Sequence, residues 1–466
     1  MAANGATVEE RRARGRAARD AAPRKAHGDW VPPPGRAGAI GMLERQGETR
    51  VPELLPIRYA RMAASPFAFF RGNAAIMAAD LAETPRSGLS AQLCGDAHVS
   101  NFGGFAAPDR ELVFDLNDFD ETFPGPWEWD VKRLGASVAV AARDAGLGAR
   151  DRRGAVTAVG RAYREAMREF AEMRNLDLWY ARLDADEIVT RVRGGLGEKA
   201  ARKVERDMER AERKNSLRAL AKLTRRVDGE LRLISDPPLL VPITELLPAA
   251  EAAALVDALT ALVRDYADTL RPDLRPVVQS YRAVDIARKV VGVGSVGTRA
   301  WVVLMLGRDE DDPLFLQVKE AQRSVLQPHL GRSRYANQGR RVVEGQRLMQ
   351  ASGDLLLGWI RTKGIDQDER DFYVRQLWDW KLSVAIESFG AAGFERYGSL
   401  CGATLARAHA RTGDRVAIAA YLGNSDSFEN ALARFAESYA DTNESDHRAL
   451  VEAIGSGRVA ADTGAV

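Results

Sequence analysis

Two hydrophobic periodicities alternate along this chain of 466 residues, and the changes between them divide it into segments. Apolar residues at 51–82 recur every three or four positions, which predicts helices that end at the Pro85–Gly88 turn. Residues 89–130 instead hold short apolar runs separated by glycine and proline turns, which predicts strands. The pattern of residues 132–266 is again mainly helical.

Strand character returns at residues 281–318, where two apolar runs flank a glycine-rich turn. A helical pattern follows at 339–349, a strand pattern at 371–378, and helical patterns over most of 381–455. Helices and strands that are mixed in this way predict an α+β fold.

Two segments stand out by charge. Residues 1–36 place many arginines among Ala, Gly and Pro without a periodic apolar face, so we expect residues 1–50 to form a mobile basic arm. Residues 199–226 contain eleven Lys or Arg against four acids. The mixed signs favour a solvated helix surface, and binding of a nucleic acid through these two segments is the alternative.

Composition adds limits to this picture. The hydrophobic content of 45%, the charged content of 28% and the formal net charge of +2 are typical of a soluble protein without an obligatory polyanionic partner. No apolar run reaches the roughly 18 residues of a membrane helix, so we expect no membrane partner. Only Cys94 and Cys401 are present, which predicts a cytoplasmic protein without structural disulfides or a zinc site.

The loop from Cys94 to Asn101 is the first candidate for chemistry. Asp96 and Asn101 lie five residues apart in a loop that a glycine opens. Phosphoryl transfer uses such a pair, because an Asp orients the attacking hydroxyl while an Asn oxygen binds a metal ion without repelling phosphates. An Asx-rich turn without catalytic function remains the alternative.

An acidic cluster follows the next apolar run, at Asp115 to Glu121. Carboxylates this close repel each other unless cations neutralise them, and oxygen ligands suit Mg²⁺. Together with Asp96 and Asn101, the Asp118–Asp120 segment resembles the catalytic and metal-binding loops of aminoglycoside phosphotransferases and kinases. The resemblance implies that Asp96 is the base and that Asn101 and Asp118 bind Mg²⁺, with Asp115 as a second candidate ligand.

A G-x-G-x-x-G turn supplies a candidate nucleotide-binding loop. It contains Gly292, Gly294, Ser295 and Gly297. Because an apolar strand pattern follows the turn, and not a helix, it fits the glycine loop of kinases better than the dinucleotide-binding turn.

Two further residues complete the predicted nucleotide site. Lys319 ends an apolar strand pattern, as does the phosphate-binding lysine of kinases, and Glu344 lies in the following helical segment where the partner of that lysine is expected. An ordinary surface ion pair is the alternative for Glu344.

From about residue 61 to residue 446 the chain resembles the bacterial domain of unknown function 2252 family, which is itself similar to the kinase-like superfamily. The resemblance is carried by Phe69–Gly72, Cys94–Gly103, Asp115–Arg133, Lys289–Thr298 and Val343–Met349. The spacing to Asp130 also matches that of the phosphotransferases, which implies a structural role for this residue.

The order of these motifs is reversed relative to ordinary kinases, because Lys319 follows Asp96 by more than 200 residues. Leu405–His409 resembles the helix that precedes the catalytic loop in aminoglycoside phosphotransferases. The resemblance therefore implies a two-lobed kinase-like fold that is circularly permuted. Its expected parts are a largely helical large lobe at 51–280, a nucleotide-binding small lobe at 281–385, and a helical return to the large lobe at 386–466.

We thus expect an ATP- and Mg²⁺-dependent phosphotransferase whose acceptor is an unknown hydroxyl-bearing small molecule or protein. Nucleotidyl transfer on the same fold, a catalytically silent nucleotide-binding or scaffold protein, and a nucleic-acid-binding protein are the alternatives. The nucleic-acid partner is the least expected of these.

Overall fold

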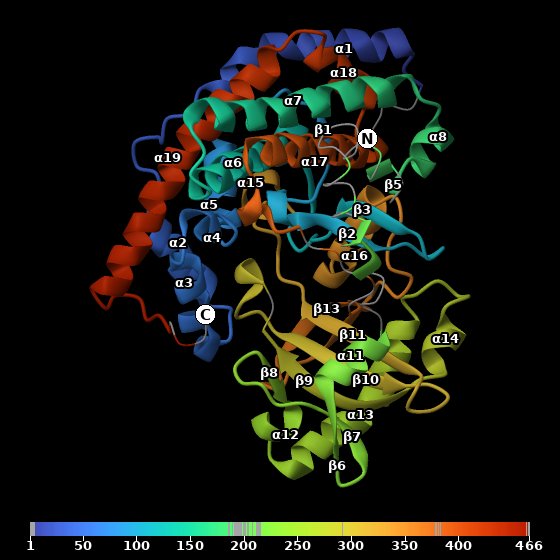
Figure 1. Ribbon diagram of the computed structural model, residues 1–466. Coiled ribbons are helices and arrows are strands. Elements are labelled where there is room, and N and C mark those ends of the chain that lie inside the picture. The colour runs from blue at the N-terminus through green and yellow to red at the C-terminus, as the bar shows by residue number, and fades with distance from the viewer. Residues whose placement is uncertain are drawn as a thin grey trace.

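Two groups of elements face each other in the computed structural model, one mainly helical and one built on a β-sheet (Figure 1). The structure describes residues 5–462 and 464, except for residues 185–186, 189, 191–197, 199–201, 203–204, 207, 211–215, 291, 378–379, 381 and 383. Much of the charged segment at 199–226 therefore lies outside the described residues. The α+β class expected from the sequence is confirmed.

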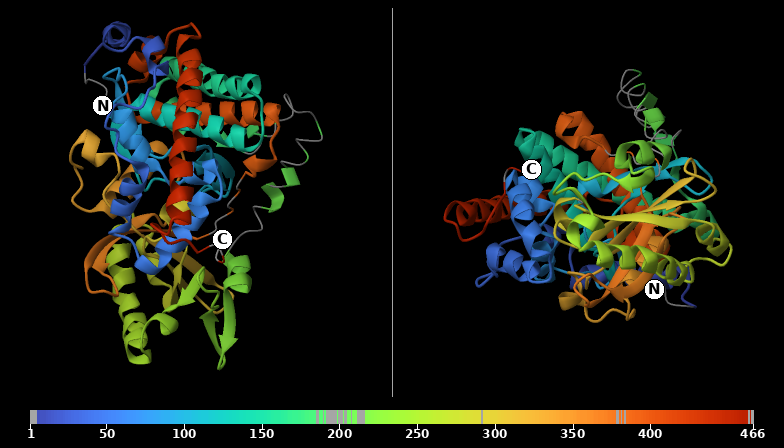
Figure 2. Two further views of the ribbon diagram at one scale, coloured as in Figure 1. Left: turned by 90° about the vertical axis from the view of Figure 1, so that its left-hand side faces the viewer. Right: turned by 90° about the horizontal axis from the view of Figure 1, so that it is seen from below.

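The helical lobe combines elements from the two ends of the chain. Its helices are α1 (Val8–Ala21), α2 (Ala39–Gly47), α3 (Leu55–Ala63), α4 (Pro66–Phe70), α5 (Ala74–Ala82), α6 (Trp127–Asp144), α7 (Ala149–Glu172), α8 (Asn175–Tyr180), α17 (Ala391–Thr412), α18 (Arg415–Leu422) and α19 (Ser427–Gly455). Its strands are β1 (Ser90–Leu93), β2 (Phe102–Ala106), β3 (Leu112–Leu116), β4 (Phe123–Pro126) and β5 (Leu183–Asp184). The long α19 runs along one side of this lobe (Figure 2, left).

Helix α17 packs lengthwise against α7 in the centre of the helical lobe. A Cβ atom on Gly402 would lie 2.5 Å from the carbonyl oxygen of Val159, so only glycine permits this approach. Within the described part of the chain, no helix is both long enough and apolar enough to cross a membrane.

The second lobe is built on an antiparallel sheet with the strand order β12-β13-β11-β10-β9-β8. Its strands are β8 (Leu240–Pro242), β9 (Arg282–Lys289), β10 (Ala300–Leu306), β11 (Pro313–Glu320), β12 (Gly358–Lys363) and β13 (Glu369–Gln376), beside the separate hairpin of β6 (Thr224–Val227) and β7 (Glu230–Leu233). Its helices are α11 (Ser216–Leu223), α12 (Ile243–Leu246), α13 (Ala249–Ala267), α14 (Arg275–Gln279) and α16 (Gln338–Met349), and α15 (Gln327–Leu330) reaches back to the helical lobe.

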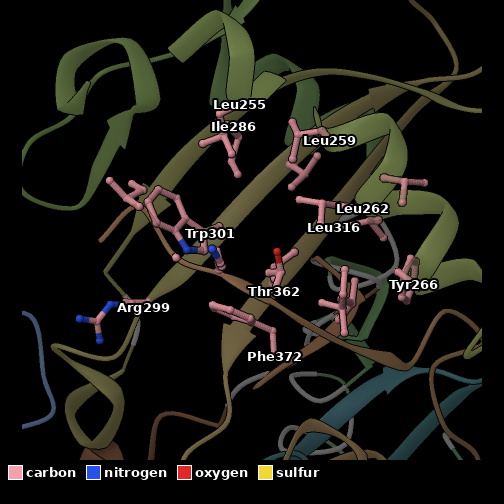
Figure 3. Close-up of a pocket in the computed structure, with 18 residues that line it drawn as sticks. Leu255, Leu259, Leu262, Tyr266, Ile286, Arg299, Trp301, Leu316, Thr362 and Phe372 are labelled. Carbon is pink, nitrogen blue, oxygen red and sulfur yellow. The ribbon is translucent and has the colours of Figure 1, made fainter. Parts of the chain in front are cut away.

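The two faces of this sheet differ in chemistry. Helix α13 covers the face away from the helical lobe, whereas α16 lies between the sheet and that lobe (Figure 1). Beneath α13, apolar side chains such as Leu259, Leu316 and Phe372 line a cavity of about 100 Å³ (Figure 3). Because side chains alternate along a strand, the neighbours of Leu316 and Phe372 point to the face that meets the helical lobe.

Most expected elements are present, with two corrections. The helices expected at 51–82 and 339–349 and the strands expected at 281–318 are confirmed. The mainly helical pattern expected at 132–266 is wrong at the short strands β6, β7 and β8, of which β6 and β7 are partly exposed and β8 is buried. Because β8 pairs with β9 and α13 packs on the same sheet, the second lobe begins near residue 216 and not at 281.

The expectation of a mobile arm at the N-terminus is also wrong for the described residues. Helix α1 begins with a capping box between Thr7 and Glu10 and packs against α18. Arg11 pairs with the buried Asp414 at 2.8 Å, and Arg24 donates to the carbonyl oxygen of Leu422 at the end of α18. Several of the arginines that suggested a solvated arm therefore have partners about 400 positions away.

A buried ion pair joins β3 to α17. Both carboxylate oxygens of Asp115 accept hydrogen bonds from Arg407, at 2.6 and 2.7 Å, and the two side chains are 3% and 6% exposed. Asp115 also accepts the backbone N–H groups of Leu116 and Ala351. Removing one partner of such a pair leaves an uncompensated buried charge.

We therefore expect Arg407→Met to lower the free energy of unfolding by about 3–5 kcal/mol, measured by chemical denaturation. The double variant Arg407→Met/Asp115→Asn should lose less than the sum of the two single variants, because no isolated charge remains. Arg174→Met, which removes an exposed pair with Asp177, is the control and should leave the denaturation midpoint almost unchanged. A wild-type midpoint for Arg407→Met would show that the pair does not support the fold.

Candidate active site in the cleft between the lobes

A cleft of about 620 Å³ lies between the two lobes. The helical lobe contributes Asp96, Asn101 and Asp118 to its wall, and the sheet lobe contributes Lys319 and the 292–295 turn. The structure thus brings the acidic loops and the predicted nucleotide-binding residues to one cavity. Its volume is in the range of pockets that hold small organic ligands, roughly 300–1,000 Å³.

The loop that carries Asp96 is held from behind by Asp130. This carboxylate accepts the backbone N–H groups of Cys94 at 2.8 Å and Gly95 at 3.1 Å. Gly95 has a φ of +83°, and a Cβ atom there would lie 2.3 Å from the carbonyl oxygen of Glu121, so both conformation and space require glycine. Asp130 therefore supports the loop and does not face the cleft.

The carboxylate of Asp96 is fixed by Arg133 of α6. The guanidinium donates to one carboxylate oxygen from Nε at 2.9 Å, and its Nη2 lies 2.7 Å from the same oxygen in an ion pair. Burial raises the pKa of Asp96 to about 6, although Arg133 acts in the opposite direction. Asp96 is thus mainly ionised at neutral pH but can be protonated in mild acid.

Asn101 and His98 surround Asp96 in the same loop. The side-chain amide of Asn101 donates to the carbonyl oxygen of Asp96 at 2.8 Å, so the Asn101 side-chain oxygen is the atom that can bind a cation. Nε2 of His98 lies 3.9 Å from the Asp96 carboxylate. Burial lowers the pKa of His98 well below its usual value, so this ring is neutral. His98 lines the cleft, although no motif of the sequence indicated a role for it.

Asp120 is the residue at which the two lobes meet. Its carboxylate forms an ion pair with Lys319 and accepts a hydrogen bond from the Tyr373 hydroxyl at 2.7 Å. Burial alone would lower the pKa of Lys319, but the carboxylates of Asp118 and Asp120 outweigh burial and raise it. Burial would likewise raise the pKa of Asp120, and Lys319 and Tyr373 outweigh this and lower it. Both groups are therefore charged.

Asp118 lies in the same turn, where it accepts the backbone N–H of Asp120 at 3.2 Å. Asp120 was present in the acidic cluster of the sequence, but nothing in the pattern separated it from its neighbours. Glu121 also lines the cleft, and burial raises its pKa to about 7 although the N–H of Val325 acts against this shift.

Asp115 is not part of the cleft wall. Its carboxylate is buried in the pair with Arg407 and does not line the cleft, so the structure does not bring it to the position expected of a metal ligand. Asp115 lies in β3 and Asp118 lies in the turn after it. A residue near the end of a strand and one in the following turn can face opposite sides, so only Asp118 of the two lines the cleft.

Glu344 is not the partner of Lys319. It lies on α16 within 3.8 and 3.9 Å of Arg340 and Arg347, which belong to the same helix. The predicted pair is therefore absent from the described residues, and Asp120 takes its place. On α16 it is Gln346 and Gln350 that line the cleft.

The glycine turn rests directly on the helical lobe. Gly297 has a φ of +89°, and a Cβ atom on Gly294 would lie 3.0 Å from the carbonyl oxygen of Arg71. Arg50 donates to the carbonyl oxygens of Gly294 and Val296. The turn thus forms one end of the cleft, as expected from the sequence, and is anchored there by backbone contacts.

The donor set fits a magnesium ion shared with a ligand better than a metal site made by protein alone. Among the described residues, no three His, Cys, Asp or Glu side chains converge as a metal-binding group. Magnesium is commonly held by one or two carboxylates while phosphate and water oxygens complete its shell. Asn101 and Asp118, both in the cleft wall, fit this arrangement.

Comparisons with known proteins identify a family that covers both lobes of the cleft. The family model described as "Uncharacterized protein conserved in bacteria (DUF2252)" matches residues 50–453, which include every cleft residue named above. No curated protein and no solved structure matches the chain. Because the family model covers most of the chain, the protein belongs to the DUF2252 family.

Proposed function

We propose that this protein is a kinase-like phosphotransferase that uses ATP and Mg²⁺ and acts on a hydroxyl group. The observation that supports it most is the ion pair between Lys319 and Asp120, which lie 199 residues apart in sequence yet meet in one cleft. If the acidic loop and the Lys319 strand resembled kinase motifs only by chance, there would be no reason for their side chains to form a contact in the folded chain.

The order of elements in the sheet lobe supports the kinase-like part of the proposal. A strand, a glycine turn and a second strand precede β11, which carries Lys319, and helix α16 follows. This is the order in which kinases place the glycine loop, the lysine and the adjacent helix.

Contacts of α17 support the proposed circular permutation. The end of α17 lies against β1, where Thr412 accepts the backbone N–H of Gln92 at 3.0 Å. His409 lies 3.3 Å from Asp130, which holds the Asp96 loop. A chain without permutation would pass from this helix directly into that strand, so the contacts replace a covalent connection.

Each residue has a role that follows from its position. Asp96, ionised and fixed by Arg133, would orient the acceptor hydroxyl and take up its proton. Lys319 and the 292–295 turn would hold phosphate groups, and Asn101 and Asp118 would hold Mg²⁺. When bound, Mg²⁺ neutralises charge on the transferred phosphoryl group.

Nucleotide binding without transfer is a second candidate, favoured by one observation. Arg133 makes two contacts with the Asp96 carboxylate, and such pairing reduces the basicity of the carboxylate. Transfer of a nucleotidyl group in place of a phosphoryl group requires the same residues.

One experiment separates these functions. The purified protein is incubated with Mg²⁺, cell extract and ATP labelled at either the α or the γ phosphorus. Label from γ alone on an acceptor supports phosphotransfer, and label from α supports nucleotidyl transfer. Tight ATP binding without transfer of either label supports the second candidate, a nucleotide-binding protein without catalytic activity.

We expect Asp96→Asn to reduce transfer about a hundredfold or more while ATP affinity stays near that of wild type, because Asp96 faces the acceptor. The wild-type rate should rise with pH and reach half its plateau near pH 6, since the ionised carboxylate is the active form. Asp109→Asn, in the exposed turn between β2 and β3, is the control. Normal transfer by Asp96→Asn would remove Asp96 from the mechanism.

Lys319→Met should weaken ATP binding about tenfold or more, because a charge-assisted contact with phosphate is lost. Glu344→Gln should change ATP affinity less than about twofold, because the ion pairs of Glu344 in the described structure are with arginines of its own helix. Calorimetric titration of both variants with ATP gives the comparison. A larger loss in Glu344→Gln than in Lys319→Met would restore the pair expected from the sequence.

Asp118→Ala should shift the Mg²⁺ concentration needed for half-maximal transfer upward by about tenfold, because a carboxylate ligand is lost. Asp115→Asn should instead lower thermal stability and leave this concentration unchanged in the folded fraction, because Asp115 pairs with Arg407. The reverse ranking in a Mg²⁺ titration would identify Asp115 as the ligand.

A further inference from the structure

Arg375 of β13 points into the cleft beside the proposed phosphate-binding residues. Its neighbour Val374 belongs to the opposite face of the sheet and lines the apolar cavity beneath α13, whereas Arg375 lines the cleft. In the strand register Gln317 lies opposite Arg375 and Lys319 lies opposite Tyr373. Arg375 and Lys319 therefore stand on adjacent strands and face the same cavity.

The contacts of Arg375 differ from those of Lys319. Its Nε donates to the side-chain oxygen of Gln317 at 2.9 Å, and its Nη1 donates to the carbonyl oxygen of Asn117 at 3.3 Å. Both acceptors are neutral, and no carboxylate among the described residues lies within salt-bridge distance of this guanidinium. A guanidinium that is oriented in this way, and that has no carboxylate in direct contact, can bind an anion.

The charge of Arg375 is maintained by its surroundings. Burial acts to lower its pKa, but Tyr373 and the carboxylate of Asp118 outweigh burial and raise it. The Asn117 carbonyl also places the guanidinium next to Asp118, the proposed Mg²⁺ ligand. A phosphate that contacts the metal ion would therefore lie close to this guanidinium.

We propose that Arg375 and Lys319 form a two-cation subsite for the phosphate groups of the nucleotide. This inference rests on the proposed function and extends it, because it assigns a specificity-determining role to a residue that no motif indicated. Gln317 is a positioning residue that fixes the plane of the guanidinium. The ligand class is a polyphosphate with two or more linked phosphates, since two cations on adjacent strands are available.

The subsite is tested by calorimetric titration of Arg375→Met with ATP, AMP and inorganic tripolyphosphate, each in the presence of Mg²⁺. We expect affinity for ATP and tripolyphosphate to fall about tenfold or more, as for loss of a charge-assisted phosphate contact, and affinity for AMP to change less than about twofold. Arg375→Lys should recover part of the loss, because it keeps the charge but not the planar fork.

Arg282→Met is the matched control, because it removes one exposed arginine from β9 of the same sheet. It should bind all three ligands as wild type does. The melting temperatures of all variants are compared, and Arg375→Lys serves as the test if Arg375→Met does not fold.

The outcomes distinguish the two proposals. Equal ATP affinity in wild type and the Arg375 variants, or an equal loss for AMP and ATP, overturns the subsite. Arg375-dependent binding of tripolyphosphate without any nucleotide binding supports the subsite and overturns the proposed function. If the wild-type protein binds none of the three ligands, both proposals fail.

Discussion

Burying the ammonium group of Lys319 in the wall of the cleft is favourable only because carboxylates of the other lobe face it. An isolated buried charge would cost several kcal/mol, and such a group normally loses its charge instead. Here Asp118 and Asp120 keep Lys319 charged, and Lys319 and Tyr373 keep Asp120 ionised. The stability of each loop therefore depends on the other lobe, and this dependence positions the two halves of the cleft.

The acidic loops are held in turn by cations behind them. Arg133 reaches from α6 to Asp96, and Arg341 reaches from α16 to the carbonyl oxygens of Asp120 and Thr122, both at 2.7 Å. These arginines do not form the cavity wall, so they orient groups without occupying the space for a ligand. These contacts fix the loops although their carboxylates still repel each other, since burial and also neighbouring carboxylates raise the pKa values of Asp96 and Glu121.

How much the sequence predicted depended on the range of the interaction. Local signals were sufficient for the helices at 51–82, for the glycine turn and for the position of Asp96. The helix α1 was missed because arginines such as Arg11 and Arg19 find their partners, Asp414 before α18 and a carbonyl oxygen within it, about 400 residues away. Glu344 and Asp115 were misplaced for a different reason: the face of a helix or strand that meets the cleft is fixed by packing. A motif gives the residue number but not the direction of the side chain.

The distance in sequence between Lys319 and Asp120 is not a physical objection to one site. Loop-closure entropy grows only with the logarithm of loop length, so doubling a loop adds about 0.6 kcal/mol. Contacts between α17 and β1 hold together the ends that the proposed permutation separates, and Thr412 and His409 supply polar bonds at this junction. The site requires only that Lys319 and Asp120 come into contact in the folded chain. The order of these residues in the sequence affects the rate of folding more than the stability of the folded site.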